Sequence, residues 1–348
     1  MADAAGLNPA AARRGGSSPS SGTSTWRFVT RDPHWAEHTW VGPSRGRRRS
    51  LPGPRPSCYN GLMSKGFRPL AAAIALVLLV QTAVAPLPAM GATPVLIGAG
   101  DIGVCGTSTD TRVGTLIRNT PGTVFTTGDN AYNSGTAAEF TNCYAPAWGA
   151  FRSRTRPSPG NHDYKTPDAA GYFGYFGDRA GPRGRGYYSY ALGSWRIYSL
   201  NSERVTSTQL RWLRDDLANH PTSCIAAYFH RPLFSSGQHD NDASVRPLWD
   251  ALYAAGAEII VNGHDHNYER FAPMRPDGRA SGKGIREFVV GTGGTSQRSF
   301  ATIKPNSKVR QTGTWGALKL TLQTDGYSWE FVRATGIAFS DSGSGRCH

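Results

Sequence analysis

The sequence contains no internal repeat and, beyond residue 92, no concentrated run of basic residues. Solenoids and other repeat arrays are therefore disfavoured. The formal net charge is +14, but 11 of the 38 Lys and Arg precede residue 92, where only 3 of the 24 Asp and Glu lie. The remaining chain carries +6, spread along its length, and lacks the basic face that nucleic-acid binding requires. We therefore expect no nucleic-acid partner, although mildly positive surfaces attract small anions.

Long hydrophobic runs are also scarce, and the one that is present is interrupted. A basic stretch follows Met63, the run PLAAAIALVLLVQTAVAPL occupies residues 69–87, and small residues come at 89–92. This layout is typical of a secretory signal peptide cleaved near residues 89–92. A membrane anchor is the alternative, which the breaks at Gln81 and Pro86 disfavour.

Residues 1–62 have almost no apolar periodicity and are rich in Ser, Pro, Gly, Ala and Arg, which predicts a disordered tail or a mis-called start. A twin-arginine signal at 47–50 is a further possibility, but it lies far from the apolar run. We assign residues 63–91 to the signal peptide and 92–348 to one catalytic domain. The exported protein is expected to be extracytoplasmic, without stable membrane association, and its oligomeric state is left open.

Only four of the five cysteines follow the signal peptide: Cys105, Cys143, Cys224 and Cys347. An even count in an exported chain predicts two disulfide bonds, for which three connectivities exist, and buried free thiols are the alternative.

Short apolar runs alternate with helical patterns along residues 93–335. The runs at 93–100, 122–128, 224–229 and 258–263 predict buried strands, and helices are expected around 110–119, 136–150 and 244–255. A helix capped by Ser207 and a closing hairpin that turns at Asp325 are also predicted. Strands that alternate with helices predict an α/β layered fold with a partly parallel sheet.

These four buried strands and a further strand-to-loop junction, RTRPSPGNHD, end in polar clusters, which read GDIG, GDNAY, GNHD, FHRP and GHDH. Sites in open α/β sheets lie beyond the carboxyl ends of the strands, so the five clusters are expected to meet. Their carboxylates, imidazoles and amide favour Fe, Zn or Mn over a thiolate-bound metal. Two such metals activate a hydroxide between them and stabilise phosphoryl transfer.

In this order, the five motifs resemble the calcineurin-like metallophosphoesterase family over residues 96–270. The tyrosine of GDNAY and Gly103 resemble the purple acid phosphatase branch, because most other members carry a metal-binding histidine at the position of Gly103. The resemblance implies a layered metallophosphoesterase β-sandwich flanked by helices. The long all-β domain of plant members is absent, so the chain is similar to the compact bacterial secreted type.

The resemblance implies two metal ions. Fe(III) would be bound by Asp101, Asp129, Tyr132 and His266, and Zn, Fe or Mn would be bound by Asp129, Asn161, His230 and His264. His162 would bond a phosphate oxygen or the nucleophile. His239, nine residues after His230, matches the position of a leaving-group histidine.

The expected function is hydrolysis of phosphate monoesters on a small phosphorylated substrate, by attack of a metal-bound hydroxide. Phosphodiester hydrolysis on the same metals is the alternative, and a non-catalytic secreted binding protein on this fold is a second one. The predicted disulfides are Cys105–Cys143, whose cysteines follow the first two metal loops, and Cys224–Cys347, which would tie the tail to a strand.

Overall fold

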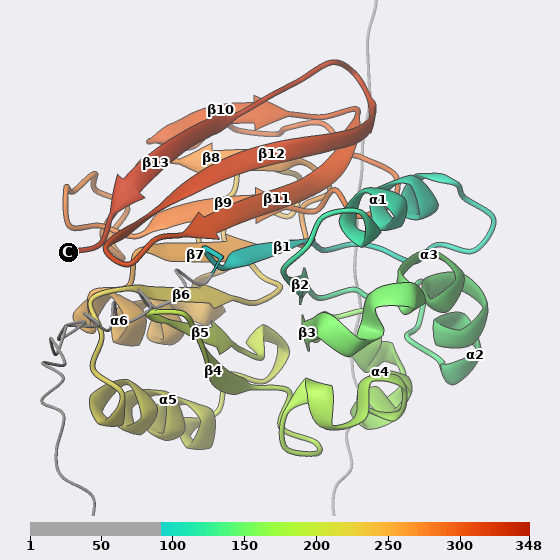
Figure 1. Cartoon of the computed structure of the whole chain (residues 1–348), viewed down its shortest axis with the longest axis horizontal. Helices are drawn as coiled ribbons and strands as arrows, with labels where there is room; N and C mark the ends of the chain where they lie inside the picture. Colours follow the sequence, from blue (N-terminus) through green and yellow to red (C-terminus); the bar gives the residue numbers. More distant parts are fainter. Residues whose placement is uncertain (1–91) are drawn as a thin grey trace, which may run out of the picture. The chain divides into compact units, whose positions relative to one another are not determined.

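Two β-sheets packed face to face form the centre of the computed structural model, which describes residues 92–348 (Figure 1). The tail predicted at 1–62 and the signal peptide predicted at 63–91 lie outside the described residues. The first sheet has the strand order β13-β12-β11-β1-β2-β3, with β13 at Ser342–Arg346, β12 at Gly326–Gly336, β11 at Thr314–Leu322, β1 at Val95–Ala99, β2 at Thr123–Thr127 and β3 at Thr155–Ser158.

The second sheet has the order β10-β8-β9-β7-β6-β5-β4. Its strands are β10 at Ser307–Gln311, β8 at Tyr268–Phe271, β9 at Arg286–Val290, β7 at Ile259–Asn262, β6 at Ile225–Tyr228, β5 at Trp195–Ser199 and β4 at Tyr188–Leu192. β1, β2 and β3 run parallel in the first sheet, as β5, β6, β7 and β9 do in the second. The carboxyl ends of the motif-bearing strands therefore meet at one edge of the sandwich.

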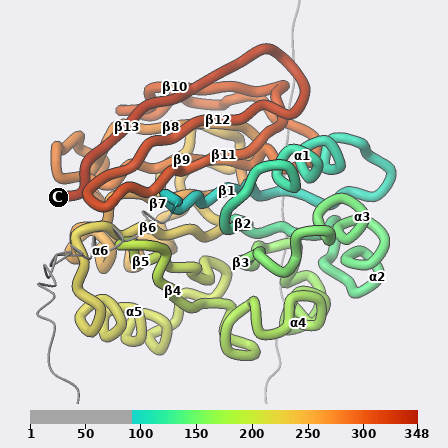
Figure 2. The backbone as a smooth tube through the Cα atoms, in the orientation of Figure 1, coloured from blue at the N-terminus to red at the C-terminus, as the bar shows by residue number. Residues whose placement is uncertain are grey.

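The helices are α1 at Thr109–Arg118, α2 at Ala137–Glu139, α3 at Ala145–Trp148, α4 at Ala170–Phe176, α5 at Ser207–Asn219 and α6 at Arg246–Ala254. The tube in Figure 2 shows α5 and α6 beside the second sheet, and α1 to α4 grouped at the other end of the sandwich. This arrangement confirms the mixed α/β fold of two sheets flanked by helices.

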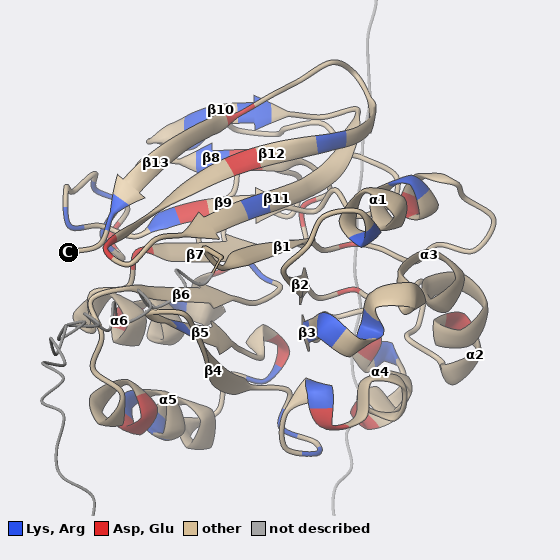
Figure 3. Ribbon diagram, viewed as in Figure 1, with Lys and Arg blue, Asp and Glu red and all other residues tan. Residues whose placement is uncertain are grey.

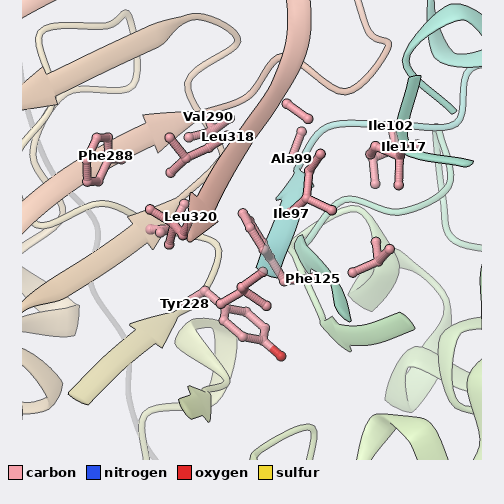
Figure 4. Packing of buried hydrophobic residues seen from close by; sticks show 14 of the residues in the cluster. Ile97, Ala99, Ile102, Ile117, Phe125, Tyr228, Phe288, Val290, Leu318 and Leu320 are labelled. Atoms are coloured by element: carbon pink, nitrogen blue, oxygen red, sulfur yellow. The ribbon is translucent and has the colours of Figure 1, made fainter. Parts of the chain in front are cut away.

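The main core lies between the two sheets (Figure 4). Ile97 and Phe125 from the first sheet face Tyr228 and Phe288 from the second, and all four are buried. A second core separates the outer face of the second sheet from α5 and α6. Both faces of the second sheet are thus covered, which explains why its central strands read as continuous apolar runs.

The structure differs from the sequence expectations at several places. Thr206, not Ser207, caps α5, because its side chain accepts a hydrogen bond from the N–H of Gln209. The helix expected at 136–150 is divided among α2, a π-turn at Phe140–Tyr144 and α3. Three strands were not anticipated: β8, β10 and β13. Each is only four or five residues long, and β10 and β13 are also polar, so none forms a long apolar run.

Both predicted disulfides are confirmed, with Cys105 bonded to Cys143 and Cys224 bonded to Cys347. Lys and Arg are interspersed with Asp and Glu over several elements in the view of Figure 3. Within residues 92–348, no helix has the length and apolar character needed to cross a bilayer.

Candidate metal centre

The seven predicted ligands come from loops that directly follow strands β1, β2, β3, β6 and β7. Three of them lie on left-handed backbone, with φ of 61° at Asp101, 49° at Asp129 and 70° at His264. Non-glycine residues rarely adopt this conformation, and where they do the surrounding structure must hold it. The strand ends therefore turn sharply, and each turn exposes a side chain beyond the sheet edge.

Glycines let these turns approach one another closely. A Cβ at Gly160 would lie 2.3 Å from the Asp129 nitrogen, and one at Gly263 would lie 2.6 Å from Asp101 Oδ2. Gly103 is also confined, though less tightly, because a Cβ there would lie 3.0 Å from the Tyr144 Cα. A side chain at Gly103 would therefore require the neighbouring backbone to shift.

The side chains of Asp101, Tyr132 and His266 form a first group. The Tyr132 hydroxyl lies 2.9 Å from Asp101 Oδ1 and 3.3 Å from His266 Nε2. His266 Nε2 lies 3.4 Å from Asp101 Oδ1. One carboxylate, one phenol and one imidazole therefore point at a common space.

Asn161, His230 and His264 form a second group. His230 Nε2 lies 3.0 Å from Asn161 Oδ1 and 3.1 Å from His264 Nδ1. Asp129 stands between the groups, because its Oδ2 is 3.1 Å from the Tyr132 hydroxyl and 3.3 Å from His230 Nε2. The structure thus brings all seven residues together, with Asp129 shared.

The chemistry of this cluster fits bound cations. Asp101 and Asp129 are buried, yet within residues 92–348 no Lys or Arg lies within salt-bridge distance of either carboxylate. Buried charges are normally paired or coordinated to metals. Single ligand atoms of Asp101, Asp129 and His230 lie within 4.8 Å of one another, which suits a metal ion.

The pKa shifts of Tyr132 and His230 reflect the negative charge of the two buried carboxylates. Burial and the charges of Asp101 and Asp129 raise the pKa of the Tyr132 phenol well above its ordinary value. Burial opposes protonation of His230, but the neighbouring Asp129 carboxylate outweighs burial and raises the pKa of His230 to about 10. Without a metal, a proton on His230 is the counter-charge, and metal binding would displace it.

Backbone carbonyl groups fix the ring orientations of His230 and His266. Nδ1 of His230 lies 2.8 Å from the Thr127 carbonyl oxygen, and Nδ1 of His266 lies 2.9 Å from the Ser296 carbonyl oxygen. Because a carbonyl can only accept, each Nδ1 carries a proton, and Nε2 is the nitrogen that faces the cluster and would bind a metal once any proton on it is displaced.

His162 and His239, the two predicted catalytic residues, lie against different members of the cluster. The His162 ring centroid is 4.4 Å from that of Tyr132, and the backbone N–H of His162 donates to Asp129 Oδ1 at 2.7 Å. The His239 ring stacks on His264 with centroids 4.2 Å apart. Both histidines therefore lie at the centre that the sequence motifs predicted.

Two basic residues at the rim were missed because no motif marks them. Lys165 Nζ lies 2.9 Å from His162 Nδ1, and the Arg298 guanidinium contacts His239 Nε2. The spacing of Lys165, three residues after His162, was a usable signal. Arg298 lies in a loop far away in sequence, and no sequence pattern indicated that it would lie near the site.

Residues 96–268 match the family described as Calcineurin-like phosphoesterase. The chain belongs to this family. It is 29% identical to Purple acid phosphatase 15 of Arabidopsis thaliana over 211 residues, which are 49% of this chain and 40% of that protein. An uncharacterized protein of Mycobacterium tuberculosis is 26% identical over 44% of this chain and 37% of its own length. The chain thus spans about two fifths of these curated relatives.

The fold matches a solved purple acid phosphatase from yellow lupin seeds. The TM-score is 0.61 at 21% identity, and the match covers 74% of this chain and 55% of the lupin chain. The curated relatives support the purple acid phosphatase-like branch of the calcineurin-like phosphoesterases, and the lupin structure shows the same fold.

Proposed function

We propose that this protein is a metal-dependent phosphoesterase that hydrolyses phosphate monoesters. The observation that carries the proposal is the convergence of seven oxygen and nitrogen donors into two groups that share Asp129. Relatives named purple acid phosphatases support the same reaction class. Family membership does not by itself establish turnover, because the relatives include Probable inactive purple acid phosphatase 27 of Arabidopsis thaliana.

In this proposal Asp101, Asp129, Tyr132 and His266 hold Fe(III), while Asp129, Asn161, His230 and His264 hold Zn, Fe or Mn. When bound, the two metals would supply an activated water and would neutralise the charge that develops on the phosphoryl oxygens. The mixed carboxylate, imidazole, amide and phenol set favours these metals over soft-ligand ones.

His162 and His239 would donate protons or hydrogen bonds to the substrate during the reaction. His162 is half-buried beside the shared Asp129, with Nε2 3.9 Å from Asp129 Oδ2, so its ring can donate to a phosphoryl oxygen held over the cluster. His239 is exposed and lies against His264, where it can donate to the departing alkoxide. General acid–base help of this kind contributes about 10²–10⁴-fold.

The test compares metal content and turnover in the purified protein. His264→Ala and Asn161→Ala should lose one metal and nearly all hydrolysis of 4-nitrophenyl phosphate. His162→Ala should keep both metals but turn over more slowly. His220→Ala is the control, because its ring lies at the end of α5, 2.9 Å from the Asp216 carbonyl oxygen. Equal metal loss in all three site variants would contradict the ligand assignment, and faster turnover of bis(4-nitrophenyl) phosphate would favour the diesterase alternative.

We also propose that residues 92–348 act as the catalytic domain outside the cytoplasm. The two disulfide bonds support an oxidising compartment. N-terminal sequencing of the exported protein should begin near Ala92, and a mature protein that retains residues 1–62 would contradict the proposal.

A further inference from the structure

Arg298 is held at the rim of the centre by its own backbone. It lies in the loop between β9 and β10, where its N–H donates to the His266 carbonyl oxygen at 3.0 Å. Its carbonyl oxygen accepts from the Thr312 hydroxyl at 2.9 Å. The Arg298 Cα is therefore tied to one predicted metal ligand and to the segment that leads into β11.

The loop around Arg298 is joined to the loop that carries His239. The Ala301 N–H donates to the Ser236 carbonyl oxygen at 2.8 Å, and the Gln238 side chain donates to the Ser299 hydroxyl at 3.1 Å. Both bonds hold the segment that directly precedes His239 in sequence. The two loops therefore form one wall of the site, with Arg298 and His239 side by side on it.

Most N–H donors of the Arg298 guanidinium have no hydrogen-bond acceptor within residues 92–348. One N–H group contacts Nε2 of His239. Within residues 92–348 no carboxylate lies within salt-bridge distance of Arg298, and its side chain makes no other hydrogen bond. A guanidinium carries five N–H donors in a planar fork that matches carboxylate and phosphate oxygens. A half-buried fork with most of its donors unused is suited to an anion from outside the chain.

We infer that Arg298 binds a second acidic group, a carboxylate or a phosphate, on the leaving-group part of the substrate. The inference rests on the proposed function, which places the reacting phosphoryl group over the metal cluster and His239 at the departing oxygen. Arg298 lies beyond His239, so it meets the atoms that follow this oxygen. The preferred substrates are then phosphate monoesters with an additional negative charge rather than esters of neutral alcohols.

A positioning role for Arg298 makes a different prediction. Because a guanidinium can only donate, Nε2 of His239 accepts and the ring proton lies on Nδ1. Loss of this contact would disorder His239 and would slow every substrate by the same factor. Recognition of a leaving-group charge, in contrast, changes the ratio between a charged substrate and its neutral isostere.

The experiment measures kcat/KM for 4-carboxyphenyl phosphate and 4-carbamoylphenyl phosphate, which have nearly the same shape and differ by one charge. The metal-loaded native protein should prefer the carboxylate by about tenfold, a typical contribution of one charge-assisted hydrogen-bond pair. Arg298→Gln should reduce the preference to about one, mainly through KM, and Arg298→Lys should retain part of it. Arg333→Gln on β12, whose side chain is exposed, is the matched control and should keep the preference.

Binding of the corresponding benzylphosphonates, which cannot be hydrolysed, separates this inference from the proposed function. A carboxylate preference in binding that Arg298→Gln removes would support the inference even in a protein that shows no turnover. No preference in the native protein, or an equal loss for both compounds in Arg298→Gln, would overturn it. Absence of turnover with both esters would contradict only the proposed function.

Discussion

At the scale of single residues, the site depends on backbone conformations that the sequence indicates only indirectly. Glycine precedes Asp101, Asp129 and His264, and this made a sharp turn predictable at each strand end. The positive φ values fall on the Asp and His residues themselves, which no residue pattern announces. The motifs therefore predicted which side chains come together. The strained backbone conformation that orients these side chains is visible only in the structure.

In the proposed assignment, Tyr132 is the ligand that would distinguish a purple acid phosphatase-like centre from other two-metal centres. Burial and the neighbouring carboxylates of Asp101 and Asp129 raise the pKa of its phenol, so only a strong positive charge can hold it as phenolate near neutral pH. We predict that the iron-loaded, oxidised protein has a visible phenolate-to-Fe(III) charge-transfer band, which Tyr132→Phe abolishes while the fold persists. Visible absorption and far-UV circular dichroism of the two proteins check this.

Tyr172→Phe provides a matched control, because Tyr172 is also buried but its hydroxyl donates to the Pro157 carbonyl oxygen, away from the cluster. Its band should be unchanged. Iron-loaded protein without a band, or a band that survives in Tyr132→Phe, would contradict tyrosinate ligation and leave the two-metal assignment standing.

At the scale of elements, the loop that follows β6 owes its shape to buried carboxylates of the second sheet. Glu287 on β9 accepts from the N–H of Leu233 at 3.0 Å, and Glu269 on β8 accepts from the N–H of Ser236 at 2.8 Å. Asp265 accepts from the N–H of His239 at 2.9 Å. The sequence indicated apolar strands. It could not show that their acidic residues accept hydrogen bonds from this loop, because the bonded residues lie far apart along the chain.

Glu287 makes the stability of this arrangement dependent on pH. Burial raises its pKa well above the ordinary 4.5, since only its Oε1 has hydrogen-bond partners within residues 92–348. Above pH 4.5 the folded protein therefore binds more protons at this site than the unfolded chain, and the free energy of unfolding falls as pH rises. The contribution is at most about 1.4 kcal/mol per pH unit.

We predict that Glu287→Gln flattens this decline, because glutamine keeps an acceptor oxygen and has no proton to lose. Urea unfolding followed by tryptophan fluorescence between about pH 5 and pH 8 measures the slope. Glu330→Gln, an exposed carboxylate on β12, should leave the slope unchanged. An unaltered slope in Glu287→Gln would mean that Glu287 is ionised in the folded protein over this whole range.

At the scale of the whole molecule, the first and the last strands of residues 92–348 belong to the same sheet. β1 begins the first sheet and the hairpin of β11 and β12 returns to it after the second sheet is complete. The alternation of strands and helices predicted the parallel parts of both sheets. It could not predict β13 or β10, because short polar edge strands are specified by their partners rather than by their own composition.

The disulfides act on different parts of this assembly. Cys224 precedes β6 in the second sheet and Cys347 follows β13 in the first, so their bond links the sheets. Cys105 follows the Asp101 turn, and its bond to Cys143 holds the helical segment next to that turn. The loops closed span 123 and 38 residues, which in the chain-entropy account correspond to about 5 and about 4 kcal/mol.

We predict that replacing Cys224 and Cys347 together by Ala lowers the free energy of unfolding by about 5 kcal/mol, while metal content and turnover at low temperature stay at the native level. Replacing Cys105 and Cys143 should lower it by about 4 kcal/mol and also reduce metal occupancy, because the Asp101 turn loses its restraint. Urea unfolding and metal analysis of both double variants separate the two effects. Equal metal loss in both variants would mean that the centre responds to global stability, and the local role of Cys105–Cys143 would then be wrong.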